Sequence, residues 1–215
     1  MNDTILGWHF VREDRKLRDG QIVKSGRVYR LPKGQTPELC ERGYHASERA
    51  IDALKYAPGP VVCRVELRGT IIPDTDKAVA TERKVLWVAD ATTVLHELAC
   101  WCAERALRAE RKAGREPDPR SWEAVKVKRR WLAGKATNQE LSAAWSAADS
   151  AAASWSAARS AAWSAADFAA GAASWSGWSA ARSTVRSASR SAAARSAVRS
   201  AADRKLTSML EALHG

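Results

Sequence analysis

The segment Val61–Leu67 reads VVCRVEL, and its pattern decides how the first half of the chain folds. Apolar and charged side chains alternate along it with a period of two, which predicts a β-strand with one face against a core. The core-facing side chains of that strand are Val61, Cys63, Val65 and Leu67. A Pro-Gly-Pro sequence before the strand and Gly69 after it mark its two ends.

Further strands are predicted on both sides of this segment. They are Ile5–Val11, Arg27–Leu31 and Lys84–Val88, and turn residues separate them. A short helix over Glu48–Tyr56 follows Ser47, which is a suitable N-cap residue. We therefore expect the α+β class, with a small mixed β-sheet and one helix packed on it.

The following residues favour helices. Asp90 is a candidate N-cap for a helix that reaches Lys112, and Ser121 for a second helix that ends near Leu132. Thr137-Asn138-Gln139-Glu140 has the form of a capping box, which predicts the start of a third helix. The expected organisation is an α+β domain over 1–114 (sheet 1–89 plus helix 90–113), a linker with a basic helix over 115–136, and a helical module over 137–215.

The segment Ser142–Ala202 consists almost entirely of alanine and serine, which fill 42 of its 61 positions. It contains a repeat, SAAWSAADSAAASWSAAR over Ser142–Arg159, which begins again at Ser160. Because alanine is the strongest helix former, the segment is predicted to be helical rather than disordered. We expect an antiparallel hairpin of two helices, Asn138–Ala170 and Ser179–Leu213, with its turn near Gly171 and Gly177.

An 18-residue repeat equals five helical turns, so equivalent residues of the two copies share one face of a helix. Arg159 lies four residues from a tryptophan on either side, where cation–π contacts are feasible. The second arm is rich in arginine, although its arginines face two different directions. The predicted interaction residues are Trp145, Trp155, Arg159, Trp163, Arg182, Arg186, Arg190, Arg195 and Arg199.

Charge and composition limit the possible partners. The net charge of +11 is spread over the chain, which suits an acidic protein surface or nucleic acid. The basic run Lys126, Lys128, Arg129 and Arg130 on the second helix could contact phosphate, although such runs are usually solvated. With no apolar span and no signal-like N-terminus, we expect a cytoplasmic protein without a membrane segment.

Four stretches of the first half are distinctive: LCERGYHAS (Leu39–Ser47) and IDALKYAPGPVVCRVEL (Ile51–Leu67), followed by DKAVATERKVLW (Asp76–Trp87) and ADATTVLHELACWCAE (Ala89–Glu104). Through them the chain, over most of its length, resembles a group of uncharacterised proteins from bacteriophages, prophages and metagenomes. Such proteins also continue into Ala- and Trp-rich repeats. The resemblance implies a phage origin and carries no established activity.

Two constellations could carry chemistry. Cys40 and His45 in a loop, with His96 and Cys100 at i,i+4 on a helix, could supply four zinc ligands, although buried cysteines are more often simple packing residues. An ADP-ribosyltransferase-like site would need a His, a Tyr and a Glu, for which His45, Tyr44, Glu66 and Glu82 are candidates alongside His9 and Tyr56. Phosphate-loop, Gly-x-Ser-x-Gly and His-Glu-x-x-His motifs are absent. No cofactor is predicted.

The leading expectation is a phage-encoded, non-enzymatic interaction protein that acts in host takeover or counter-defence. It would bind a host macromolecule, or assemble with itself, through its C-terminal helices. An ADP-ribosyltransferase-like enzyme that uses NAD is the alternative from another class, and a nucleic-acid-binding protein is a further one.

Overall fold

The computed structural model describes residues 4–152 and 192–214. The chain divides into two compact units, one of residues 1–91 with 206–215 and one of residues 92–205. The helix that follows the sheet therefore groups with the later helices. Each unit is described by itself below.

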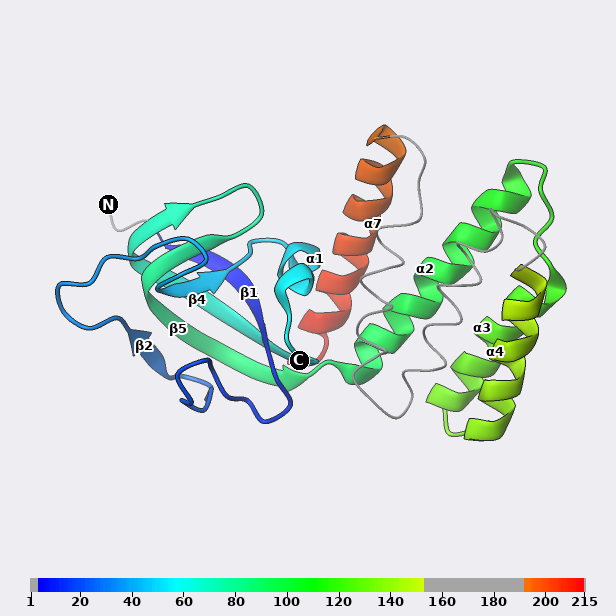
Figure 1. Cartoon of the computed structure of the whole chain (residues 1–215), viewed down its shortest axis with the longest axis horizontal. Helices are drawn as coiled ribbons and strands as arrows, with labels where there is room; N and C mark the ends of the chain where they lie inside the picture. Colours follow the sequence, from blue (N-terminus) through cyan, green and yellow to red (C-terminus); the bar gives the residue numbers. More distant parts are fainter. Residues whose placement is uncertain (1–3, 153–191, 215) are drawn as a thin grey trace. The chain divides into compact units, whose positions relative to one another are not determined.

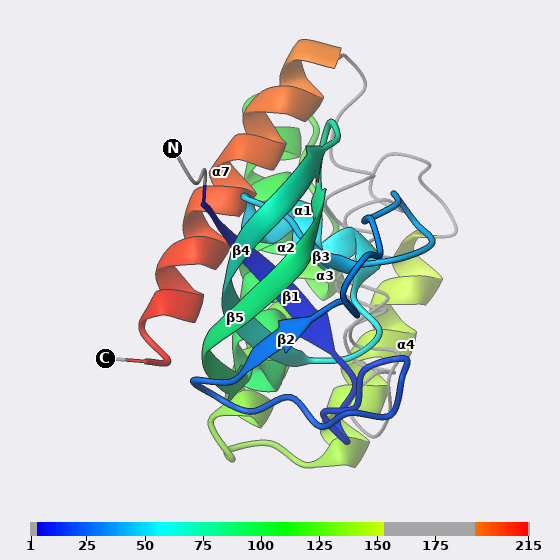
Figure 2. The same cartoon turned by 90° about the vertical axis from the view of Figure 1, so that its left-hand side faces the viewer.

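Five strands form the sheet of the first unit: β1 (Ile5–Val11), β2 (Val28–Arg30), β3 (Tyr44–Ala46), β4 (Val61–Pro73) and β5 (Ala78–Asp90). Their order is β1-β4-β5-β2, and β3 also pairs with β5. The two longest strands, β4 and β5, form a hairpin of 13 residues on each side (Figure 1). Its twist, typical of paired strands, is visible in Figure 2.

The α+β class is confirmed, and the strand expected at Val61–Leu67 lies at the centre of the sheet between β1 and β5. All pairings between the described strands are antiparallel, where a mixed sheet was expected. The prediction that the apolar side chains of VVCRVEL face a core is confirmed, because all four belong to one buried cluster. The buried residues of this core are Val11, Val23, Tyr29, Ala46, Val61, Cys63, Val65, Leu67, Ala78, Ala80 and Val85.

The short helix after β3 is smaller than expected. It consists of α1 (Ala50–Ala53) followed by a single 3₁₀ turn, η1 (Leu54–Tyr56). The prediction that Ser47 caps it is wrong, because Arg49 occupies the N-cap position and makes no capping bond through its side chain. The backbone of Ser47 instead exchanges two hydrogen bonds with Trp8, of 2.7 and 3.0 Å, which fasten this segment to β1.

The second unit contains α2 (Thr92–Lys112), α3 (Pro119–Leu132) and α4 (Asn138–Ala152). Asp118, rather than Ser121, caps α3, because its carboxylate accepts from the amide of Arg120 at 2.9 Å and Pro119 occupies the first turn. The capping box is confirmed, since Thr137 and Glu140 bond each other's amides at 3.1 and 2.7 Å. The buried core of these helices is Ala99, Cys100, Ala103, Leu107, Ala124, Val125 and Ala148.

The last helix, α7 (Ala192–Glu211), lies within the second predicted arm of the Ala/Ser module. Leu206 and Leu210 in its apolar stripe are fully buried, whereas Leu213 is 39% exposed. The two ends of the module are therefore helical, and the expected turn at Gly171 and Gly177 lies outside the described residues. No described helix is both long enough and apolar enough to cross a membrane.

Candidate functional site

The loop before β3 positions Tyr44 and His45 on the edge of the sheet. Gly43 adopts a φ of +119°, and a Cβ atom there would lie 2.6 Å from the side chain of Val79. Only glycine satisfies both conditions, so the sequence RGYHAS encodes a sharp entry into the strand. The β3 residues then pair with β5, with Tyr44 opposite Ala80 and His45 opposite Val79.

A buried arginine lies beside this strand. Arg83 of β5 is 2% exposed, and its Nη1 donates a hydrogen bond to the backbone carbonyl of His45 at 3.1 Å. Its guanidinium lies over the ring of Tyr44, 5.3 Å from the ring centre, and that ring lies 6.1 Å from the ring of Tyr29. Sequence reasoning missed Arg83, and the only available signal was a charged residue within a strand-forming run.

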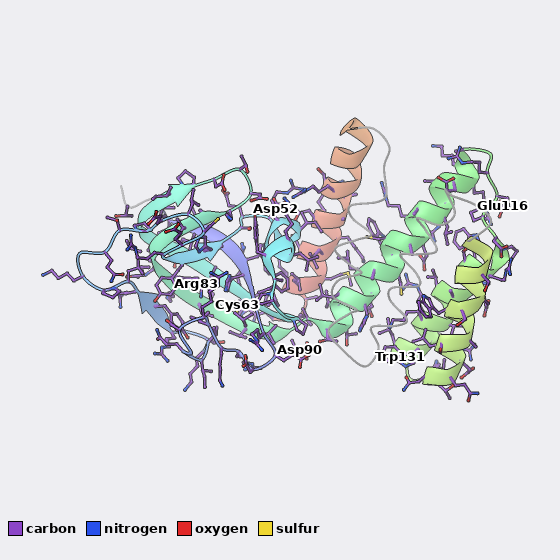
Figure 3. All side chains as sticks on the ribbon, in the orientation of Figure 1. Asp52, Cys63, Arg83, Asp90, Glu116 and Trp131 are labelled. Atoms are coloured by element: carbon purple, nitrogen blue, oxygen red, sulfur yellow. The ribbon has the colours of Figure 1, made fainter. Side chains whose placement is uncertain are left out.

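The arginine lies among ionisable groups that burial keeps neutral. Figure 3 shows Arg83 and Cys63 on the sheet, and burial raises the pKa of the Cys63 thiol to about 12. His9 pairs with Cys63 across β1 and β4. Burial, followed by the charge of Arg83, holds the pKa of His9 well below its usual value. Burial and Lys77 also lower the pKa of His45.

A second group of polar side chains surrounds Cys40. This exposed residue has a φ of +68°, and its amide donates to Nε2 of His45 at 3.1 Å. The ammonium of Lys77 lies 3.0 Å from the Cys40 sulfur and 4.3 Å from the centre of the Tyr56 ring. Cys40 and His45, the loop half of the proposed zinc set, are thus joined by a hydrogen bond through the histidine nitrogen.

The helical half of that set lies in the second unit. His96 and Cys100 are both buried on α2, and burial together with Lys128 lowers the pKa of His96 to about 4. Burial raises the pKa of the Cys100 thiol to about 11. Within residues 4–152 and 192–214, no three His, Cys, Asp or Glu side chains are grouped as metal ligands. The described geometry gives the zinc hypothesis no support.

The carboxylates nominated for ADP-ribose transfer take part in ion pairs. Glu66 accepts a short hydrogen bond from Arg68. Glu82 accepts one from Arg30 at 2.6 Å. The hydroxyl of Tyr44 donates to the carbonyl of Arg30 at 3.3 Å. These contacts give each nominated carboxylate a structural role.

The basic run on α3 is largely neutralised by acidic side chains. Arg129 bonds Glu104 at 2.6 Å, Arg130 bonds Glu140 at 2.9 Å, and Lys126 lies 3.8 Å from Glu123. Lys128 is buried at 1% exposure, with its ammonium 4.0 Å from the centre of the Trp131 ring. The four cations therefore do not form a free phosphate-binding stripe.

Few of the predicted interaction residues fall in the described part of the chain. Trp145 lies on α4, partly buried, and its indole N–H has no hydrogen-bond partner among the described residues. Arg199 is partly buried on α7, and Arg195 belongs to the same helix. The others, Trp155, Arg159, Trp163, Arg182, Arg186 and Arg190, lie outside the described residues.

Comparison with known proteins adds one finding. No curated protein and no solved structure matches the chain significantly. A family model described as a domain of unknown function, DUF7666, matches residues 5–97. The match covers all five strands and the beginning of α2. The first half of the chain is therefore similar to a recognised domain family whose function is unknown.

Proposed function

We propose that this chain is a phage-encoded, non-enzymatic interaction protein that acts in the cytoplasm of a bacterial host. It binds a host macromolecule, or a second copy of itself, through the Ala/Ser/Trp-rich helices. Host takeover or counter-defence suits this origin, which rests on the resemblance of Leu39–Ser47 and Ile51–Leu67 to phage proteins.

The observation that carries the proposal is the packing of α4, where the Ala/Ser segment begins. Ala148 is fully buried and belongs to the core that α4 forms with α2 and α3, and Leu141 is 2% exposed. A small residue at such a contact lets helix backbones approach closely. The start of the segment is thus a packing surface, and the tryptophans that follow supply the large side chains that dominate binding interfaces.

The test is native mass spectrometry of the full-length protein combined with capture from a bacterial lysate. We expect an oligomer or a stoichiometric complex with a host partner. A variant carrying Trp155→Ala, Arg159→Ala and Trp163→Ala should lose it. The matched control is Trp175→Ala with Trp178→Ala, which removes two tryptophans of the same segment outside the predicted face. A wild-type protein that stays monomeric and captures nothing would refute the proposal.

A second candidate is an ADP-ribosyltransferase-like enzyme. The observation in its favour is that Tyr44 and His45 lie together on β3, where the charge of His45 also affects the pKa of His9. Release of nicotinamide from NAD, lost in His45→Ala and retained in His96→Ala, would support this activity.

The hypothesis of a nucleic-acid-binding protein would require binding of nucleic acid that weakens steeply as the salt concentration rises. The ion pairs of the α3 cations provide little basis for it.

A further inference from the structure

We propose that the face of the sheet formed by Trp8, Arg64 and Trp87 is a docking surface for an amphipathic helix of a protein partner. The chain's own C-terminal segment, residues 206–214, occupies this surface and competes with that partner. The three residues and the segment belong to the same compact unit. The inference goes beyond the proposed function, because that function uses the Ala/Ser/Trp-rich helices and this surface lies on the sheet.

Trp8, Arg64 and Trp87 form a row across three neighbouring strands. Arg64 of β4 is paired with Trp8 of β1 on one side and with Trp87 of β5 on the other. Residues that are directly opposite in antiparallel strands point to the same face of a sheet. Cys63 and Val65, the neighbours of Arg64 along β4, belong to the buried core described above. The row therefore lies on the face opposite that core.

The side chains of this row contact one another. The guanidinium of Arg64 lies 4.5 Å from the centre of the Trp8 ring. The ring centres of Trp8 and Trp87 are 5.7 Å apart in an edge-to-face arrangement. The Nη1 atom of Arg64 is buried and has no hydrogen-bond partner among the described residues. Tryptophan and arginine are enriched among the residues that dominate protein–protein binding, so the composition of the row suits a docking surface.

The C-terminal segment presents a helix face to this row. Leu206, Leu210 and His214 follow one another at intervals of four residues, which places them along one side of a helix. Both leucines are fully buried, and the ring centre of His214 lies 5.3 Å from that of Trp87. The side of the segment that carries these three residues is therefore the side that meets the sheet.

The segment in place defines the chemistry of the partner that the surface fits. That partner is an amphipathic helix with two leucines one turn apart and an aromatic ring one turn farther on, a spacing by which such helices bind other proteins. Arg64 favours an acidic residue on this helix, in the place that Glu211 has here. Burial lowers the pKa of Arg64, and the charge of Glu211 opposes that shift.

Two observations indicate that the segment can leave the sheet. Within residues 4–152 and 192–214, no hydrogen bond or ion pair joins it to a strand, and the amides of residues 212–214 donate only to carbonyls of the same segment. A segment held by apolar and ring contacts alone opens more easily than hydrogen-bonded strands. The family model includes Trp8, Arg64 and Trp87 but ends at residue 97, so the segment is an addition to the recognised domain.

The experiment measures how a fluorescein-labelled peptide of residues 203–215 binds the full-length protein, by fluorescence anisotropy. The double variant Leu206→Ala, Leu210→Ala weakens the occupant and leaves the surface intact. We expect its dissociation constant for the peptide to be at least tenfold lower than that of the wild type. A surface that is occupied about nine-tenths of the time raises the apparent dissociation constant about tenfold. The matched control, Lys205→Ala with Ser208→Ala, changes two exposed positions of the same helix and should bind like the wild type.

Two further measurements locate the binding. A peptide carrying Leu206→Asp and Leu210→Asp should not bind the double-alanine variant. The indole N–H signal of Trp87 in the NMR spectrum of that variant should shift when the unmodified peptide is added. Equal peptide affinity in the double-alanine variant and the wild type would overturn the proposal, as would binding of the Asp-substituted peptide or an unchanged Trp87 signal.

Hydrogen exchange of the wild-type protein tests the proposal if the double-alanine variant fails to fold. We expect the amides of residues 206–211 to exchange at least tenfold faster than those at the centres of β4 and β5, because the segment opens separately from the sheet. Equal protection in the segment and the two strands would overturn the proposal. A segment that leaves the sheet only when the sheet unfolds cannot give its place to a partner.

Discussion

At the residue scale, Lys128 shows how burial changes the meaning of a charged side chain. The sequence groups it with three other cations as a possible phosphate contact, yet the structure buries it on α3 against Trp131. Its Nζ has no hydrogen-bond partner among the described residues, and burial lowers its pKa to about 8. Helical spacing separates it from Lys126, because Lys128 lies four and three residues after the buried Ala124 and Val125, whereas Lys126 lies on the exposed side of the helix.

We predict that Lys128→Met stabilises the protein at pH 7 by about 1–3 kcal/mol. The charged lysine is disfavoured by burial, whereas methionine fills similar space without a desolvation cost. The cation–π contact with Trp131 offsets the gain by roughly 1 kcal/mol. Urea unfolding monitored by circular dichroism measures the difference.

The dependence on pH provides a second measurement of the same prediction. The folded pKa of Lys128, about 8, lies below the ordinary value of 10.5, so the unfolded chain binds the proton more tightly. The wild type therefore gains stability as pH rises from about 8 to 10.5, and its deficit relative to Lys128→Met should shrink over that range. The exposed neighbour Lys126→Met is the control and should change stability by less than about 0.5 kcal/mol. A constant deficit across this range would contradict the assigned pKa.

At the element scale, local signals succeeded where the partner lies within the same turn. Thr137 and Glu140 are three residues apart, and their reciprocal bonds follow from that spacing alone. Ser47 and Ser121 have side chains that are equally suitable for capping, yet the predictions that they cap the next helix were wrong. The backbone of Ser47 pairs with β1, and Asp118 before a proline starts α3 one turn earlier. For Ser47 the competing partner lies in another element, β1. For Ser121 the competing cap is an aspartate followed by a proline, two signals that are each weak alone.

Thr137→Ala should destabilise α4 by about 1 kcal/mol, because the amide of Glu140 loses its capping oxygen. The expected result is faster amide exchange in the first turn of α4, measured by hydrogen exchange and mass spectrometry. Thr137→Ser retains the hydroxyl and should behave like the wild type. If Thr137→Ala and Thr137→Ser exchange at equal rates, the capping bond contributes nothing.

At the scale of the whole molecule, the sequence predicted the elements better than the site. Alternation in VVCRVEL predicts one strand and its buried face, and short strand-like runs between turn residues located β1 and part of β5. The surroundings of Arg83 depend on β2 and β3 both pairing with β5, which brings Tyr29 and Tyr44 to it from distant positions in the sequence. Such a juxtaposition has no periodic signature, so no spacing in the sequence indicates it.

The division of the chain into two compact units leads to a prediction about cooperativity. Ala148 is fully buried where α4 meets the core of α2 and α3, so a larger side chain there would press on the neighbouring core residues. Ala148→Leu should cost about 1–3 kcal/mol through overpacking. The loss of hydrogen-exchange protection should be confined to α2, α3 and α4, while β4 and β5 retain theirs. The matched variant Ala143→Leu, at an exposed position of the same helix, should leave protection unchanged. Equal loss in the strands and the helices after Ala148→Leu would show that the two units unfold as one.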